Sequence, residues 1–307
     1  GTNAEALIGN DYHSIFGGGA DDVPGAVARS SAYNRHLNKF NTTPAIYRLF
    51  DPEIDMRYDH NFLGKLYALK DASGFSPVEG GDPIDIKKGD VVLEFRPWNS
   101  PATTPAARGL DVGGTLPYSV INTDEYGRID ASKYHDPYKS PMMWKFWEPG
   151  IPYGDGGGTF DFALFRSAEA YLIAAEAIVK GATGGSLGSA DVYYNKIVDR
   201  ALGDNAGADP LQASAPEDIT SLASKSYRAT GANIDIDMIL DERARELMGE
   251  YVRWYDLKRT GKLIERATKY NPWTAASGSL DEHHLLRPIP QQEIDLSTNN
   301  LGQNPGY

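Results

Sequence analysis

The chain has 307 residues, of which 41% are hydrophobic and 23% charged, a composition typical of a globular protein with a sizeable core. Its formal net charge of −12 argues against nucleic-acid binding and against adsorption to anionic lipid. The absence of cysteine excludes disulfides, thiol catalysis and cysteine-based zinc sites, and no run of about 20 apolar residues predicts a transmembrane helix.

Residues 1–160 form a loop-rich part, because glycine clusters and prolines repeatedly interrupt the periodic segments. Two short segments, 63–69 and 90–95, have the composition of β-strands. Segment 43–50, with Pro44 near its start, predicts one or two helical turns. We therefore expect an irregular region that contains short strands and a few short helices.

The pattern becomes helical near Asp161, which is expected to N-cap a helix that ends at Gly181. A Gly-rich loop leads to a second predicted helix over 190–202, which ends at Gly203. Together they predict an αα-hairpin with the geometry of a tetratricopeptide unit. One such hairpin is not stable alone, so it has to dock on another part of the protein. The apolar positions of the first helix are Leu164, Phe165, Ala168, Leu172, Ala175, Ile178 and Val179.

A third helix is predicted to begin near Asp235 or Asp237 and to end at about Met248. Six apolar residues keep a helical spacing, and the last two of them lie beyond that end: Leu240, Ala244, Leu247, Met248, Tyr251 and Tyr255. The opposite face carries Asp241, Glu242, Arg243, Arg245 and Glu246. Two interpretations remain open for these charges: a solvated face, or an interlocking structural contact.

Residues 184–188 read G-G-S-L-G and match the G-x-S-x-G pattern of serine hydrolases. A nucleophile of that kind requires a buried strand before Ser186 and a helix after it. Here a helix precedes the pattern and the surrounding residues are Gly, Ser, Thr and Ala, so a flexible linker is the favoured interpretation.

The histidines form no H-E-x-x-H motif or other close ligand pair on a helix. His283 and His284 are adjacent, so on regular structure their side chains are expected to point apart. We therefore expect no transition-metal site and no cofactor, whereas a Ca²⁺ ion bound in a loop is left open. No local arrangement among the 42 acidic residues identifies a carboxylate pair for glycoside hydrolysis.

Aromatic residues are crowded in 118–153, where interleaved prolines and glycines place them on loops. An aromatic ring can stack on the apolar C–H face of a sugar, and neighbouring polar groups can bind its hydroxyls. The other interpretation is that these rings fix the loops to the core. The candidate ligand-binding residues are Trp98, Tyr138, Trp144, Trp147 and Trp273.

Five separated segments of the sequence carry recognisable motifs. Residues 51–58 read D-P-E-I-D-M-R-Y and residues 166–177 read R-S-A-E-A-Y-L-I-A-A-E-A. Residues 239–248 read I-L-D-E-R-A-R-E-L-M, and R-W-Y-D-L-K-R follows at 253–259. The last of these segments, 286–296, reads L-R-P-I-P-Q-Q-E-I-D-L. In this order, the segments resemble motifs of the SusD/RagB family of surface nutrient-binding outer-membrane lipoproteins.

The resemblance implies a mostly α fold, with one or more tetratricopeptide-like helical hairpins and an irregular loop-rich region containing short β-strands. Its ligand-facing loops would lie in 1–160 and its helical C-terminal region in 161–307. Family members are normally much longer, so we expect the N-terminal helical part of the family to be missing from this chain.

The resemblance also implies a function: non-catalytic binding of an oligo- or polysaccharide at the cell surface. The glycan would be delivered to a SusC-like TonB-dependent transporter. The protein would be held on the outer membrane only through a lipidated residue upstream of this chain. Alternatives left open are a peptide-binding protein of the same architecture and a glycoside hydrolase.

A final expectation concerns the segment 253–259. We interpret Arg253, Trp254, Asp256 and Arg259 as structural residues, and we expect the three charged ones to form internal ion pairs rather than to contact ligand.

Overall fold

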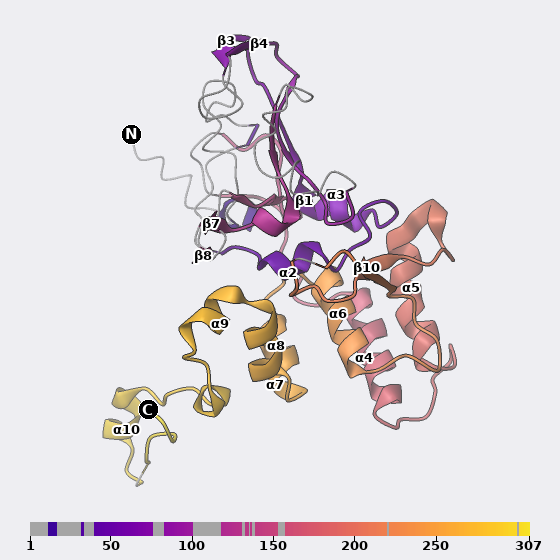
Figure 1. The fold of residues 1–307 in the computed structure, drawn as a ribbon. Helices are drawn as coiled ribbons and strands as arrows, with labels where there is room; N and C mark the ends of the chain where they lie inside the picture. The colour runs from indigo at the N-terminus through magenta and orange to yellow at the C-terminus, as the bar shows by residue number, and fades with distance from the viewer. Residues whose placement is uncertain are drawn as a thin grey trace.

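The protein is described by a computed structural model that covers residues 12–16, 32–33, 40–75, 83–100, 118–130, 133–134, 136, 139–152, 157–219, 221–299 and 301–307. Within these residues a strand-containing part precedes a helical part along the chain. Figure 1 shows the two parts lying against each other, with the helices below the strands and the C-terminal segment at the far end.

The strand-containing part is built from short strands and three short helices. The helices are α1 (Tyr12–Ile15), α2 (Pro44–Tyr47) and α3 (Arg57–Asn61). A three-stranded sheet has the order β2 (Lys65–Tyr67), β5 (Val91–Phe95) and β6 (Ser119–Ile121). β2 is antiparallel to β5, whereas β5 and β6 are parallel. The predicted strands in 63–69 and 90–95 and the predicted helical turn in 43–50 are thus confirmed.

The remaining strands of this part form two-stranded antiparallel pairs. β1 (Phe62–Leu63) pairs with β9 (Met142–Met143), so that Phe62 lies opposite Met143. β3 (Ala72–Phe75) pairs with β4 (Ile84–Ile86), and β7 (Arg128–Asp130) pairs with β8 (Lys133–Tyr134). A 3-10 turn, η3 (Thr123–Glu125), lies between β6 and β7.

An aromatic core holds these short elements together. The Tyr47 ring lies 4.6 Å from Phe62 and 4.9 Å from Tyr126, between ring centres, and all three residues are buried. Inclined ring pairs of this kind add to the free energy gained by burying their area. Since strands of two to five residues make few backbone hydrogen bonds, side-chain packing is the main stabilising contribution here.

Helices α4 (Ser167–Val179) and α5 (Ala190–Leu202) pack side by side (Figure 1). Ala168, Leu172 and Ala175 are buried at helical spacing on α4, and they share a core with Tyr194 and Val198 of α5. The prediction of a helix over 190–202 is confirmed, and Gly203 ends it with a φ of +55°.

The predicted start of the first helix at Asp161 is wrong. Arg166 has extended backbone (φ −145°, ψ 161°), and α4 begins only at Ser167. Leu164 and Phe165, which were expected on the apolar face, are 87% and 62% exposed. The physical reason is that the Arg166 guanidinium is held by Glu246 and Glu250, which orients the chain away from the helix axis at this residue.

Helix α6 (Ile236–Glu246) lies against α4. Its N-cap is Asp235, whose side chain accepts the backbone N–H of Met238 at 2.7 Å. The helical spacing that was expected to continue through Tyr251 is interrupted, because Gly249 and Tyr251 have φ values of +77° and +58°. Tyr251 and Tyr255 are consequently exposed rather than packed in line with Leu240.

Shorter helices complete the chain: α7 (Arg253–Arg259), α8 (Leu263–Tyr270), α9 (Pro272–Ser277) and α10 (Gln291–Leu296). The 3-10 turn η6 (Glu282–Leu285) lies between α9 and α10. Between α5 and α6 lie the 3-10 turn η5 (Gly203–Asn205) and the antiparallel pair β10 (Leu211–Ala213) and β11 (Ser224–Ser226). More of the described residues lie in helices than in strands, as expected. The tetratricopeptide-like geometry of α4 and α5 stays a prediction.

Two further points concern elements that bear on function. Among the described residues, none of the helices has both the length and the apolar character needed to cross a membrane. Ser186 of the G-x-S-x-G match lies in an exposed turn between Gly185 and Gly188, without the preceding strand that a nucleophile elbow requires.

Candidate functional site

The charged face of α6 is buried and interlocking rather than solvated. Asp241, Glu242, Arg243, Arg245 and Glu246 all have little or no exposed surface. Charges removed from water in this way are tolerated when each one has ionic and hydrogen-bonding partners. The partners come from both parts of the chain, so this face of α6 joins them.

Arg245 is fully buried and makes contacts in several directions. Its guanidinium donates to Glu242 at 2.7 Å, to the Leu49 carbonyl at 3.0 Å and to Gln212 at 2.6 Å. It also lies 4.0 Å from the centre of the Tyr227 ring, within cation–π range. The planar donor fork of arginine suits such a set of fixed acceptors.

Glu246, at the end of α6, is held by three arginines: Arg57, Arg166 and Arg200. Arg57 also pairs with Asp55 at 2.8 Å and with Glu242 at 2.6 Å. Burial by itself raises the pKa of Glu246, but the charges of Arg57 and Arg166 outweigh burial and lower that pKa to about 2. Glu246 is therefore ionised at neutral pH.

Glu250 forms a second carboxylate centre close by. It accepts from Arg166 at 2.8 Å and from the Lys145 ammonium at 2.6 Å. Burial raises its pKa, and the hydrogen bond from Arg166 and the charge of Lys145 reverse that effect, so the pKa is lowered. Burial lowers the pKa of Lys145, while Glu250 acts in the opposite direction.

These charges form one wall of a cavity of about 330 Å³. Aromatic rings form another wall, in which Tyr12 lies 4.6 Å from Phe146 and 4.7 Å from Phe162, between ring centres. Because the charged groups are largely engaged with one another, the network acts mainly as a rigid frame that positions the aromatic wall. The cavity is lined by Tyr12, Phe146, Phe160, Phe162, Arg57, Lys145, Arg166, Arg200, Glu246 and Glu250, among others.

Phe146 and Lys145 belong to a segment that we call the aromatic loop, residues 142–148. Trp144 and Trp147 of this loop stack face to face, with ring centres 4.1 Å apart and an angle of 11° between the planes. The loop is fixed at its start by the β1–β9 pair and by the backbone N–H of Trp144, which donates to the Asn61 carbonyl at 2.6 Å. Trp144 packs on the aromatic core and Trp147 stacks on Trp144, and both are partly exposed.

The other predicted ligand residues have different positions. Trp98 is 3% exposed and its indole N–H donates to the Phe50 carbonyl at 2.9 Å, a placement that argues against contact with a ligand. Trp273, on α9, packs over Gly127 and is partly buried. Tyr138 lies outside the described residues.

The segment 253–259 has the internal contacts of a structural element. Buried Asp256 accepts from Arg243 at 2.6 Å and from Arg259 at 2.9 Å. Arg253 differs from the expectation, since it donates to the Leu240 carbonyl at 2.7 Å and forms no salt bridge within the described residues. Burial, together with the charge of Arg266, lowers the pKa of Arg253 to about 10. The Trp254 ring lies under the Arg287 guanidinium at 5.1 Å.

The expectation that the side chains of His283 and His284 point apart is wrong. Their ring centres are 3.8 Å apart, and both rings lie beside Asp281. The expectation applied the geometry of regular helices and strands, whereas these residues lie in the 3-10 turn η6.

Sequence reasoning did not identify the residues that form the cavity. Arg57 and Arg166 lie in segments that carried the family resemblance, but nothing in their local pattern assigned them to Glu246. Tyr12 lies in loop-rich sequence without periodicity, and Phe162 follows Asp161 at the predicted start of a helix but was not among its apolar positions. Local sequence patterns could not have indicated the ion pairs with Glu246, because Arg166 and Arg57 are 80 and 189 positions away from it.

The sequence model described as the SusD family matches residues 20–307 of the chain. SusD-like protein P2 of Formosa agariphila is 31% identical over 199 residues, which cover 64% of this chain and 34% of that protein. SusD-like protein P25 of the same organism is 29% identical over 163 residues, which cover 51% of this chain and 26% of that protein. The chain thus spans about a third or less of the length of either relative.

Among solved structures, the chain is similar to surface glycan-binding protein A from Bacteroides thetaiotaomicron in complex with laminarihexaose. The two are 26% identical, with a TM-score of 0.35, over 57% of this chain and 33% of that one.

Proposed function

The chain belongs to the SusD family, and from this premise we propose that it binds a glycan without hydrolysing it, for delivery to a SusC-like TonB-dependent transporter of the outer membrane. Glycan is the ligand class that the family resemblance implies. The proposal for the site itself is carried by one observation, the stacked pair of Trp144 and Trp147 on the aromatic loop.

The Trp pair has the physical properties of a sugar-binding platform. Stacking on Trp144 fixes the plane of the Trp147 ring, and the core beneath Trp144 fixes the pair as a whole. A flat ring held in this way offers apolar area to the C–H face of a pyranose at a low cost in side-chain entropy. We retain Trp273 and Tyr138 as proposed secondary contacts and give Trp98 a structural role.

The charges near the cavity support binding rather than hydrolysis. A glycoside hydrolase needs one carboxylic acid whose raised pKa keeps it protonated near neutral pH. Glu246 and Glu250 have lowered pKa values and are engaged in ion pairs, which is the opposite arrangement. We therefore propose that this site is not catalytic.

The proposed organisation follows the two parts of the chain. Residues 1–160 would carry the ligand-facing loops, and residues 161–307 would form a helical scaffold with α4 and α5 as a tetratricopeptide-like hairpin. The protein would lie at the cell surface on the outer membrane, held by a lipid anchor upstream of this chain. The transporter contact is part of the same proposal.

The test is affinity electrophoresis in native gels that contain plant, host-mucin or microbial polysaccharides. We expect one class of polysaccharide to retard the protein, Trp147→Ala to abolish the retardation, and Tyr255→Ala to preserve it. Tyr255 is a suitable control because it is an exposed aromatic residue on α7. Unchanged retardation of Trp147→Ala would refute the site, and a lack of retardation by every polysaccharide would refute glycan binding by this chain.

Peptide binding is a second candidate, favoured by a larger and mostly apolar groove of about 550 Å³. Met248, Tyr251, Arg253 and Leu257 contribute to its lining. Such a groove would suit an apolar peptide. Saturable binding of peptides from a digest, with no retardation by any polysaccharide, would favour this function over the first.

A further inference from the structure

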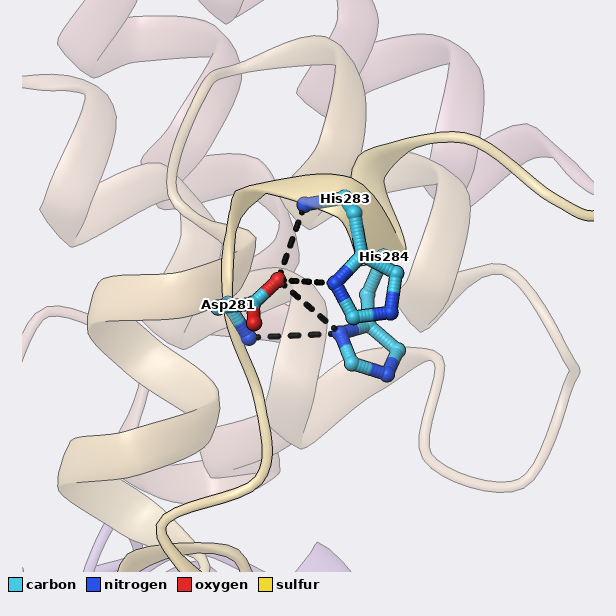
Figure 2. A group of neighbouring side chains, drawn as sticks. All are labelled: Asp281, His283 and His284. Atoms are coloured by element: carbon cyan, nitrogen blue, oxygen red, sulfur yellow. Dashed lines mark hydrogen bonds and ion pairs between the residues drawn. The ribbon is translucent and has the colours of Figure 1, made fainter. Parts of the chain in front are cut away.

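Asp281, His283 and His284 bring three potential metal ligands together near the C-terminal end of the chain. Figure 2 shows the two imidazole rings beside the Asp281 carboxylate, on one side of the turn η6. One ligand atom from each residue can be chosen so that all three lie within 4.8 Å of one another. Among the residues that the structure describes, no other group of three His, Cys, Asp or Glu residues has its ligand atoms this close together.

The local backbone explains why these side chains meet. Asp281 caps η6 and its Oδ1 accepts the His283 N–H at 3.0 Å. The His284 Nδ1 accepts the Asp281 N–H at 3.2 Å. These two bonds fold the turn so that the His283 and His284 rings lie on the same side as the carboxylate.

The donor spacing fits a small divalent ion. Zn²⁺ binds imidazole nitrogen and carboxylate oxygen at about 2.0–2.2 Å, so two ligands of a tetrahedral ion lie roughly 3.4 Å apart. The Asp281 Oδ1 and the His284 Nδ1 are separated by 3.5 Å. Because the His284 Nδ1 also accepts the Asp281 N–H, a bound ion takes the place of that hydrogen bond on this nitrogen. The His283 Nδ1 lies close to the same carboxylate oxygen.

Access and chemistry agree with this assignment. The side chains of Asp281, His283 and His284 are 65%, 28% and 32% exposed, so an ion and its remaining water ligands can enter. Two imidazoles and one carboxylate form a donor set that suits Zn²⁺ and neighbouring transition metals, whereas Ca²⁺ prefers oxygen ligands alone.

The C-terminal residues support the His283 ring from behind. The Tyr307 ring meets it edge to face, with centres 5.0 Å apart, and the Tyr307 hydroxyl donates to the Leu286 carbonyl at 2.9 Å. Gly306 lies so close that an added Cβ would be 2.6 Å from the His283 Cβ. Contacts that fix the orientation of a ligand ring strengthen metal binding.

We propose that Asp281, His283 and His284 form a binding site for a divalent transition-metal ion of the Zn²⁺ type. The ion joins the side chains of Asp281, His283 and His284 within the turn η6. Because the His283 ring packs against Tyr307, the ion also stabilises the contact between η6 and the end of the chain. This site is independent of the proposed glycan function, because it uses none of the residues of the aromatic loop or of the cavity.

The experiment is isothermal titration of ZnCl₂ into tag-free protein that has been treated with chelator and then exchanged into metal-free buffer. We expect saturable binding of one ion in the micromolar range, and no binding in a parallel titration with CaCl₂. His283→Ala and His284→Ala should each weaken zinc binding by at least about tenfold. His60→Ala, an exposed histidine on α3, is the matched control and should bind zinc as the wild type does.

Asp281→Asn separates metal binding from helix capping. Asparagine caps as well as aspartate, so the melting temperature of the metal-free variant should be unchanged while its zinc affinity falls. Zinc should also raise the melting temperature of the wild type and have a smaller effect on this variant. Absence of saturable zinc binding, or zinc affinities of the two histidine variants equal to that of the wild type, would overturn the proposal.

Discussion

Arg57 and Glu246 are 189 positions apart, yet the Arg57 Nη1 donates to the Glu246 Oε2 at 3.0 Å. Arg57 belongs to α3 in the strand-containing part and Glu246 to α6 in the helical part. The two parts are thus joined by buried charges as well as by apolar packing. Removing one member of such a buried network leaves its partners uncompensated, which is more costly than losing the contact itself.

The first prediction concerns Arg245. Arg245→Met removes the charge at the centre of the network and should destabilise the protein by about 3–5 kcal/mol, because Glu242 loses a buried partner. Urea unfolding followed by circular dichroism measures the change. Lys87→Ala removes an ion pair whose side chains are 73% and 63% exposed, and the unfolding midpoint should stay the same. Equal midpoints for Arg245→Met and the wild type would contradict the prediction.

The second prediction concerns pH. The pKa of Glu246 is lowered from its ordinary value of 4.5 to about 2 in the folded protein, so the unfolded chain binds the proton more tightly. The stabilisation that this carboxylate contributes, about 3 kcal/mol, is complete above pH 4.5 and is lost as the pH falls toward 2. Glu246→Gln should be less stable at pH 7 and should lose less stability over that range. Parallel pH profiles of the free energy of unfolding for variant and wild type would exclude this role.

The third prediction compares two glycines that both have positive φ. Gly261→Ala, at φ +72° with open space around the new Cβ, should cost about 1 kcal/mol from backbone strain. Gly249→Ala, at φ +77°, should cost clearly more, because its Cβ would lie against Met143 and 2.6 Å from the Phe146 ring. Thermal unfolding of both variants gives the comparison, and equal losses would mean that the aromatic loop relaxes away from Gly249.

The fourth prediction concerns the N-cap of α6. Asp235→Ala removes the acceptor of the Met238 N–H and should cost about 1 kcal/mol. Asp235→Asn keeps an acceptor at the same position and should retain nearly all of the stability. Chemical unfolding distinguishes the two, and an equal loss in both variants would indicate that the charge of Asp235, rather than its capping bond, is what stabilises the helix.

The fifth prediction separates packing tryptophans from the proposed binding tryptophan. Trp98→Ala should destabilise the protein by about 3–5 kcal/mol, because it leaves a cavity and frees the Phe50 carbonyl. Trp147→Ala should have a smaller effect, since that ring is partly exposed. Differential scanning calorimetry checks the order of the two melting temperatures, and the reverse order would assign the structural role to Trp147.

The sequence predicted what local patterns determine. Tyr194, Ile197 and Val198 keep the spacing of a helical face, and α5 has the predicted bounds. The start of α4 was placed too early because the determining contact is the distant one between Arg166 and Glu246. A capping pattern at Asp161 carries no information about that contact.

The candidate site was less predictable than the fold for the same reason. The charges on α6 could be read as solvated or interlocking, and only the arrangement of Arg57, Arg166 and Arg200 around Glu246 decides between these. The sequence indicated a group of candidate aromatic residues, but it did not indicate which of them are buried. The sequence around Trp98 and around Trp147 gives no reason to assign them different roles. In the folded protein Trp98 is a core residue.

Lys145 lies between the two stacked tryptophans in the chain, and its ammonium donates to the carbonyls of Glu246 at 2.9 Å and Met248 at 3.1 Å. The aromatic loop is therefore held at the C-terminal end of α6 before any ligand arrives. Its conformational entropy is lost when the protein folds and not when a ligand binds. Ligand binding at the Trp pair should then proceed as rigid docking, with fast association and with little change in the hydrogen-exchange rates of the loop.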